Sequence, residues 1–216
     1  MTDKLLQRIQ ERYDLIPVDA GEYANLKVSG MKFHIRAFTA KGLGSVSVMT
    51  AVGFFGLMKM DTLIITPTEK DMPLCSYDRV YAMGNDTLIY ELYDTLMQKI
   101  DLSSLANVKE TYAALPEHDL GTHWYDSIKL PESLSKKGKK VHTAGFDACA
   151  MEFLNTYLDA AATAPDCNAA EKREKASVYV EGLLTHGGPS TDVFKKGIGE
   201  EKTADLFRRI LFATKV

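Results

Sequence analysis

The sequence predicts an α+β protein in which helices pack on an antiparallel sheet. In the first half of the chain, short apolar and β-branched segments alternate with turn residues, which is typical of antiparallel strands. In the second half, apolar residues recur at helical spacing instead. Strands followed by helices favour this fold class. No repeat, low-complexity tract or linker divides the 216 residues, so we expect a single domain over residues 1–216.

The expected strands follow from local patterns. Residues 45–55 have mixed periodicity, and we assign them to a strand because of their β-branched content. Gly42-Leu43-Gly44 indicates a turn, and Gly84-Asn85-Asp86 is a hairpin signal. The expected strands cover residues 23–28, 31–40, 45–55, 62–66, 78–83 and 87–94.

The expected helices have an apolar face or stripe. Leu5, Leu6 and Ile9 share one face of the first helix, and Thr2 is its expected cap. Residues 115–145 are rich in proline, glycine and lysine, which predicts mostly loop. The expected helices cover residues 2–12, 101–114, 146–158, 171–185 and 200–212.

Composition and charge exclude several classes of function. The formal net charge is −3, which gives no overall attraction to nucleic acid or to an anionic membrane, so we expect neither partner. The longest apolar-leaning stretch, residues 46–60, contains two glycines and is too short to span a bilayer. The N-terminal residues lack the pattern of a secretory signal. Three widely spaced cysteines indicate reduced thiols, and we expect a cytoplasmic protein.

No motif for a bound cofactor or metal stands out. Gly42-x-Gly44 lacks the third glycine of a dinucleotide fingerprint, and there is no P-loop, zinc-protease motif or nucleophile elbow. His118 and His123 lie five residues apart beside Trp124, where surface loop histidines are the simpler interpretation and a metal site is the alternative. An enzyme with this sequence is therefore expected to do acid–base chemistry on a substrate that holds the electrons itself.

Three segments, in chain order, resemble one known family. The first is residues 61–94, with Pro67 ending a strand, the run Met72-Pro73-Leu74-Cys75-Ser76-Tyr77-Asp78, and Asp94 ending a later strand. The second is Asp126-Ser127 after Trp124, and the third is residues 197–212, which end in Leu-Phe. This ordered set resembles the ferredoxin-dependent bilin reductase superfamily, which includes red chlorophyll catabolite reductase.

The resemblance implies both a fold and a chemistry. The family fold is a three-layer α/β/α sandwich with a central antiparallel sheet. Its enzymes reduce a linear tetrapyrrole with single electrons from ferredoxin and hold no organic cofactor. For this chain, we expect the electron donor to be ferredoxin or flavodoxin. The family's proton-donating aspartate matches Asp78. A carboxyl buried against a flat apolar substrate has a raised pKa and can hold a proton near neutrality. The alternative is that Asp78 hydrogen-bonds local backbone at a turn or strand start.

The sequence also departs from the family pattern. A histidine that often lies on the strand before Pro67 is missing, and Asp61 and Thr62 stand in its place. We expect Asp61 to form a carboxylate pair with Asp78 that shares protons. A second family aspartate, before the last helices, is missing too. His186 is the candidate replacement as a proton donor, with a loop histidine as the alternative. The expected substrate contacts are Thr62, Ser76 and Asp94, although Asp94 could instead be structural or an exposed strand-end acid.

Three functional hypotheses remain. The leading one is a reductase of a bilin or related open-chain tetrapyrrole that takes electrons from ferredoxin or flavodoxin. The donor would dock on a basic face formed by Lys129–Lys140, Lys195, Lys196, Arg208 and Arg209, although the lysine-rich part could equally be a solvated loop. The second hypothesis is a tetrapyrrole- or heme-binding carrier without turnover. The third is a small-molecule enzyme that kept only the fold.

Overall fold

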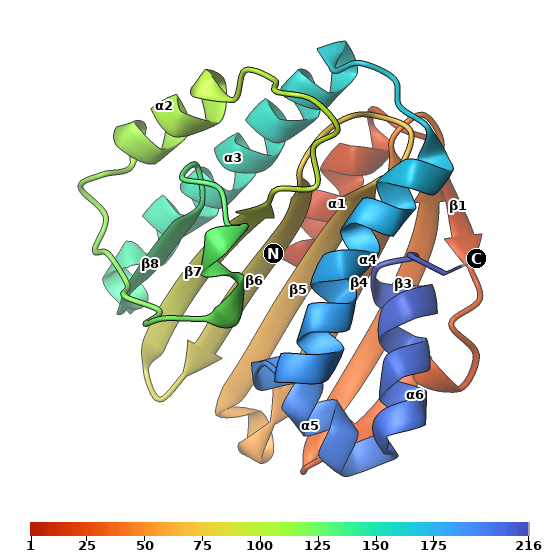
Figure 1. The fold of residues 1–216 in the computed structure, drawn as a ribbon. Coiled ribbons are helices and arrows are strands. Elements are labelled where there is room, and N and C mark those ends of the chain that lie inside the picture. The colour runs from red at the N-terminus through yellow and green to blue at the C-terminus, as the bar shows by residue number, and fades with distance from the viewer. Residues whose placement is uncertain (216) are drawn as a thin grey trace.

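The protein is a three-layer sandwich, with one eight-stranded antiparallel sheet between two layers of helices (Figure 1). The computed structural model describes residues 1–215, except for the side chain of Pro189. The predicted α+β class and α/β/α layering are therefore confirmed. The strands are β1 (Leu15–Val18), β2 (Asn25–Val28), β3 (Met31–Ala40), β4 (Gly44–Gly53), β5 (Met58–Pro67), β6 (Leu74–Ala82), β7 (Asn85–Tyr93) and β8 (Leu134–Lys139).

The sheet is built mainly as a meander. Strands β3 to β7 are neighbours in chain order, β1 and β2 both pair with β3, and β8 pairs with β7 at the other edge. The helices are α1 (Thr2–Gln10), α2 (Ser103–Thr111), α3 (Thr143–Thr163), α4 (Ala169–His186), α5 (Pro189–Ile198) and α6 (Glu200–Asp205). The chain continues from α6 into a π-helical turn, Leu206–Leu211.

The sheet separates two hydrophobic cores. The first core lies between one face of the sheet and α1, α2 and α3. The second lies between the other face and α4, α5 and the C-terminal helical segment, which cross the front of the sheet in Figure 1. Successive residues of a strand point to opposite faces. Leu63 and Ile65 of β5 accordingly enter the first core, whereas Ile64 enters the second.

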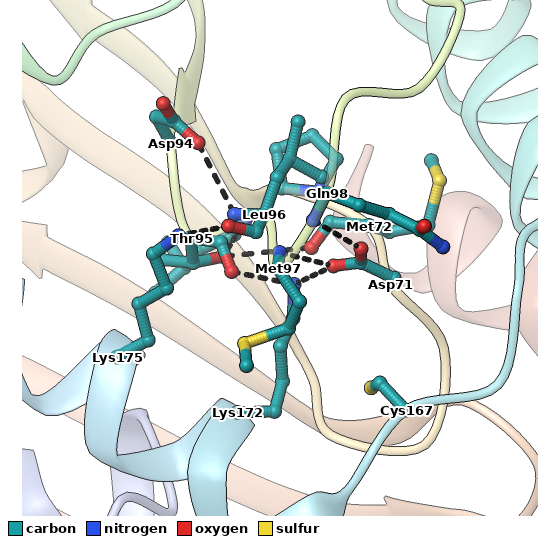
Figure 2. A network of polar contacts seen from close by, with 12 residues as sticks. Asp71, Met72, Asp94, Thr95, Leu96, Met97, Gln98, Cys167, Lys172 and Lys175 are labelled. Carbon is teal, nitrogen blue, oxygen red and sulfur yellow. Dashed lines mark hydrogen bonds and ion pairs between the residues drawn. The ribbon is translucent and has the colours of Figure 1, made fainter.

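A buried ion pair ties α4 to the loop that precedes β6 (Figure 2). Lys172 and Asp71 have side chains 0% and 1% exposed, and their charged atoms lie 2.7 Å apart. Lys172 also donates to the Thr95 carbonyl, and Asp71 accepts hydrogen bonds from the amides of Met97 and Gln98. Burial alone raises the pKa of Asp71, but these hydrogen bonds and the charge of Lys172 outweigh it and hold the pKa below its usual value. This network anchors α4 over the sheet.

Three local expectations were wrong. Residues 134–139 form β8 rather than loop, because Lys136 is 0% exposed and pairs with Glu117, so its side chain takes an inward strand position. Helix α5 was not expected, since Gly187 and Gly188 immediately before it look like the start of a loop. Thr2 lies within α1, where its hydroxyl caps nothing.

Candidate functional site

The second core encloses a cavity of about 300 Å³, which is at the small end of the range for ligand pockets. Its floor is the central sheet from β4 to β7, and its roof comes from α4, α5, the π-helical turn and the segment around Tyr125. The lining residues are mostly apolar or aromatic. They include Met49, Met60, Ile64, Val80, Ile89, Tyr93, Leu120, Tyr125, Tyr179, Leu183, Phe207, Leu211 and Phe212.

Strand register brings three of the predicted residues into this cavity. The β6–β7 hairpin pairs Ala82 with Asn85, which places Asp78 opposite Ile89. On the other side, Thr62 of β5 is opposite Asp78. Because Ser76 and Asp78 are two residues apart, both point to the same face of the sheet. Thr62, Ser76 and Asp78 all line the cavity, so the structure brings the expected proton donor together with two of the three expected substrate contacts.

The carboxyl group of Asp78 is held by hydroxyl groups alone. Thr62 Oγ1 donates to Asp78 Oδ1 at 2.5 Å, and Ser76 Oγ donates to Oδ2 at 3.5 Å. Burial raises the pKa of Asp78 to about 6; the Thr62 hydrogen bond opposes this rise, and the negative charge of Glu91 adds to it. Among the described residues that line the cavity there is no lysine or arginine. Asp78 can therefore hold a proton near neutral pH and release it to a ligand.

Asp78 does not lie at the start of a strand, where the sequence pattern predicted it. Strand β6 begins at Leu74, so Asp78 is in mid-strand, and its side chain bonds to Thr62 and Ser76 rather than to local backbone. The observed environment is that of a cavity-facing acid.

The second carboxylate of the cavity is Glu91, which the sequence analysis missed. Glu91 lies on β7 directly opposite Ser76 and is 9% exposed. Its Oε2 accepts a hydrogen bond from Tyr93 at 2.7 Å, and Lys129 Nζ lies 3.8 Å from Oε1. The signal was present in the sequence, because counting outward from the predicted hairpin places residue 91 opposite residue 76, on the same face as residue 78.

Asp61 does not pair with Asp78, and this correction has a simple cause. Asp61 is one residue from Thr62 on β5, so its side chain points to the opposite face of the sheet. It is opposite Arg79, and its Oδ2 lies 3.4 Å from the amino group of Met1 at the start of α1. The expected carboxylate pair is therefore replaced by Asp78 and Glu91.

Asp94 and His186 also lie outside the cavity lining. Asp94 is exposed just after β7, where it accepts a hydrogen bond from the amide of Leu96 at 3.1 Å (Figure 2). This is the structural alternative for Asp94 rather than a substrate contact. His186 is exposed at the end of α4 and rests against the ring of Trp124, with ring centroids 5.4 Å apart. The backbone just beyond it does contribute, because Gly188 and Thr191 line the cavity.

The histidine of the cavity is His123 instead. Its ring lies parallel to that of Tyr125, with centroids 4.8 Å apart. Trp124, the next residue, packs on α4 at Gly182, where a Cβ atom would come within 2.1 Å of the indole ring. Glycine at this position therefore lets residues 123–127 approach α4 and close the roof. The sequence had identified His123 only as a loop histidine.

Aromatic rings line one side of the cavity. Tyr93 and Tyr179 stack with centroids 3.9 Å apart, and Tyr125 meets Tyr93 edge to face. Burial raises the pKa of all three phenols, so each hydroxyl stays neutral. Ser47 of β4 donates to the Leu211 carbonyl at 2.7 Å, which holds the π-helical turn over the sheet.

Comparisons with known proteins support the fold. No family model and no curated protein matches the chain. Among solved structures, phytochromobilin synthase from tomato, in complex with biliverdin, has the same fold, with a TM-score of 0.77. The match covers 99% of this chain and 83% of that chain at 16% sequence identity. The architecture implied by the resemblance to bilin reductases is thereby confirmed.

Within residues 1–215, no helix has the length and apolar character needed to cross a bilayer. The same residues contain no group of three or more histidine, cysteine, aspartate or glutamate side chains arranged to hold a metal ion.

Proposed function

We propose that this protein reduces a linear tetrapyrrole, with single electrons from ferredoxin or flavodoxin and a proton from Asp78. The observation that carries the proposal is the Asp78 carboxyl group, which faces an aromatic-walled cavity with hydroxyl partners and no lining cation. The fold is shared with a protein solved in complex with biliverdin, which supports this substrate class. In this proposal no organic cofactor is bound, since the pigment itself accepts the electrons.

The cavity suggests how a tetrapyrrole would lie. Its volume of about 300 Å³ suits the conjugated rings of part of the pigment, with the remainder at the mouth. The propionate groups of a bilin are negatively charged, and the described lining of the cavity offers them no lysine or arginine. We therefore place the propionates toward solvent and the ring to be reduced against Asp78. Thr62 and Ser76 would orient the acid through their hydrogen bonds.

Each step of the proposed reaction balances electrons with protons. Reduction of one double bond takes two electrons, which the donor protein supplies one at a time, and two protons. The second proton comes from solvent, which reprotonates Asp78 before that proton is transferred. Asp78 gives one proton as negative charge builds on the pigment, and becomes a carboxylate. The Thr62 hydroxyl then stabilises that carboxylate through its hydrogen bond.

The structure narrows the surface proposed for donor docking. Lys136 is buried, Lys129 pairs with Asp126, and Arg208 and Arg209 pair with Glu181 and Asp205. The exposed lysines that remain are Lys137, Lys139 and Lys140 at the β8 edge and Lys196 on α5. We propose that the β8 lysines attract the acidic donor. Activity should then fall as ionic strength rises, because salt screens such attraction. Activity that is indifferent to salt would contradict this docking site.

The decisive test is an anaerobic absorbance titration with biliverdin, before and after addition of reduced ferredoxin. A shifted spectrum on binding, followed by a second change on electron supply, is the expected result. Asp78→Asn should still bind the pigment and lose or redirect its reduction, whereas the matched surface variant Asp14→Asn should behave as wild type. Asp14 is exposed and lies away from the cavity lining. An Asp78→Asn protein with full activity would remove Asp78 from the mechanism.

One observation favours the carrier as a second candidate. Thr62 occupies the position of the histidine that bilin reductases often carry, and threonine does not titrate near neutral pH. Exposed His186 does not replace it at the cavity. A carrier would bind biliverdin or heme, and the spectrum of the bound pigment would stay unchanged when reduced ferredoxin is added. If neither biliverdin nor heme binds, both candidate functions are excluded and the similarity to bilin reductases is limited to the fold.

A further inference from the structure

Glu91 stands between the cavity and the outside of the protein. A second, open pocket of about 230 Å³ lies on the surface beside β7, and its lining includes His118, Asp119 and Lys129. Glu91 and Leu120 line both this surface pocket and the inner cavity. The Glu91 side chain is therefore part of the partition that separates solvent from Asp78.

The contacts of Glu91 leave one of its oxygens open. Oε2 accepts the hydrogen bond from Tyr93, whereas Oε1 is buried and makes no hydrogen bond to any described residue. Lys129 is the nearest cation, at 3.8 Å from Oε1, but it lies closer to Asp126, at 2.8 Å. A buried carboxylate oxygen without a hydrogen-bond partner costs free energy, and a bound water at Oε1 would remove that cost.

The position of Glu91 relative to Asp78 suits proton exchange through water. Ser76 is opposite Glu91 and Asp78 is opposite Ile89, so the two acids are diagonal neighbours on one face of the sheet. Diagonal positions of this kind are about 7–8 Å apart at the backbone, which leaves long side chains within reach of one bridging water.

We propose that Glu91 is a proton relay that reloads Asp78 from the surface pocket. This inference rests on the proposed function. After Asp78 has given its proton to the pigment, Glu91 takes a proton from solvent in the surface pocket and passes it through a water to the Asp78 carboxylate. One O–H bond breaks on Glu91 and one forms on Asp78, with no change in electrons.

The relay supplies the second proton that the proposed reaction requires. A flat pigment over the sheet covers Asp78 from the cavity side, and reduction of one double bond requires two protons while Asp78 holds one. The charged and titratable groups around the route lie on both sides of Glu91. Inside they are Asp78, Tyr93, His123, Tyr125 and Tyr179, and outside they are Lys129, Asp126, His118 and Asp119.

The test compares the first and second protonation steps in Glu91→Gln. Anaerobic protein with bound biliverdin is mixed with reduced ferredoxin, and the spectra of the successive intermediates are followed. At a pH of about 5, below the pKa of Asp78, the first step should match wild type, because Asp78 is already protonated. The next proton-dependent step should slow by about 10-fold or more, since a general acid is lost. Glu91→Asp should recover part of the rate, and Glu152→Gln, on exposed α3 surface, should leave both steps unchanged.

A second readout needs no pigment. Carbon-13 NMR of the Asp78 carboxyl group in the ligand-free protein should show a lower pKa in Glu91→Gln than in wild type or Glu152→Gln, because a neighbouring negative charge is gone. Wild-type protein that does not reduce biliverdin overturns the proposed function and the relay step with it. Reduction in which Glu91→Gln matches wild type in both steps overturns the relay alone. An Asp78 pKa that is the same in wild type and in Glu91→Gln also overturns the relay.

Discussion

Asp71 and Asp78 lie seven residues apart and are both enclosed by the protein, yet their proton affinities move in opposite directions. Asp71 has a buried lysine and two backbone amides as partners, and its pKa falls below the usual value. Asp78 has two hydroxyl partners and a negative neighbour, and burial raises its pKa to about 6. The comparison shows that the partners, rather than burial alone, decide the charge of each acid.

The two environments correspond to two tasks. The Asp71–Lys172 pair stays ionised and joins α4 to the loop before β6, which stabilises the roof of the cavity (Figure 2). Asp78 faces the cavity without a cation, so it can change its protonation state during a reaction. The following predictions test this contrast, beginning with the largest expected effect.

Removal of Lys172 should cost the most stability. Lys172→Met leaves the Asp71 carboxylate buried without its cation, and breaking such a pair costs about 3–5 kcal/mol in the free energy of unfolding. Urea denaturation measures the loss, and the exposed control Lys196→Met should stay within about 0.5 kcal/mol of wild type. The double variant Asp71→Asn with Lys172→Met should regain part of the loss. A single-variant loss under about 1 kcal/mol would show that the pair is not a strong anchor.

Asp78→Asn should instead stabilise the protein, and only at higher pH. The folded pKa of about 6 exceeds the unfolded value of 3.8, so the folded state binds more protons between these values and wild-type stability falls as pH rises through them. The variant has no titrating group at this position and does not show this loss, which is up to about 3 kcal/mol in the free energy of unfolding above pH 7. Urea midpoints from about pH 4 to pH 8 measure it. Parallel curves for variant and wild type would contradict the raised pKa.

Thr62→Val tests the hydroxyl partner of Asp78. The Thr62 hydrogen bond favours the ionised acid, so its removal should raise the pKa of Asp78 further, by about one unit or less. Carboxyl NMR titration measures the shift. Thr39→Val lies outside this cavity and is the matched control. A fall in the pKa of Asp78 would mean that Thr62 supports the protonated form instead.

Asp61→Asn should have the smallest effect on the cavity. Asp61 lies on the opposite face of the sheet, so the pKa of Asp78 should move by no more than about 0.3 unit and biliverdin binding should be unchanged. The same NMR titration and absorbance experiments measure both. A clear shift in the Asp78 titration would restore Asp61 as its partner.

Much of the fold could be predicted because its signals are local. Residues 31–40 form a strand with the expected bounds, and the Gly84 hairpin sets the register that carries Ser76 and Asp78 into the cavity. Strand β8 was missed because the aliphatic part of Lys136 occupies a core position, and a sequence pattern scores lysine as polar.

The site was predicted less completely, for a geometric reason. Asp61 was expected to pair with Asp78 because it lies where the family carries a histidine. Adjacent residues of a strand face opposite sides of the sheet, however, so Asp61 points away from the cavity that Thr62 lines. Glu91 was overlooked because its closeness to Asp78 depends on pairing between strands. The cavity roof, with His123 and Tyr125, depends on how a loop packs against α4, and no local pattern encodes that contact.

The division of the sheet into two faces has a consequence for evolution and engineering. On β5 and β6, even-numbered positions such as Met60, Thr62, Ser76 and Val80 line the cavity, and their odd-numbered neighbours build the opposite core or its edge. Substitutions at even-numbered positions can therefore change ligand preference, while the odd-numbered positions keep the opposite core and the fold unchanged. A library restricted to even positions of these two strands should retain folded members at high frequency and still sample new pigments.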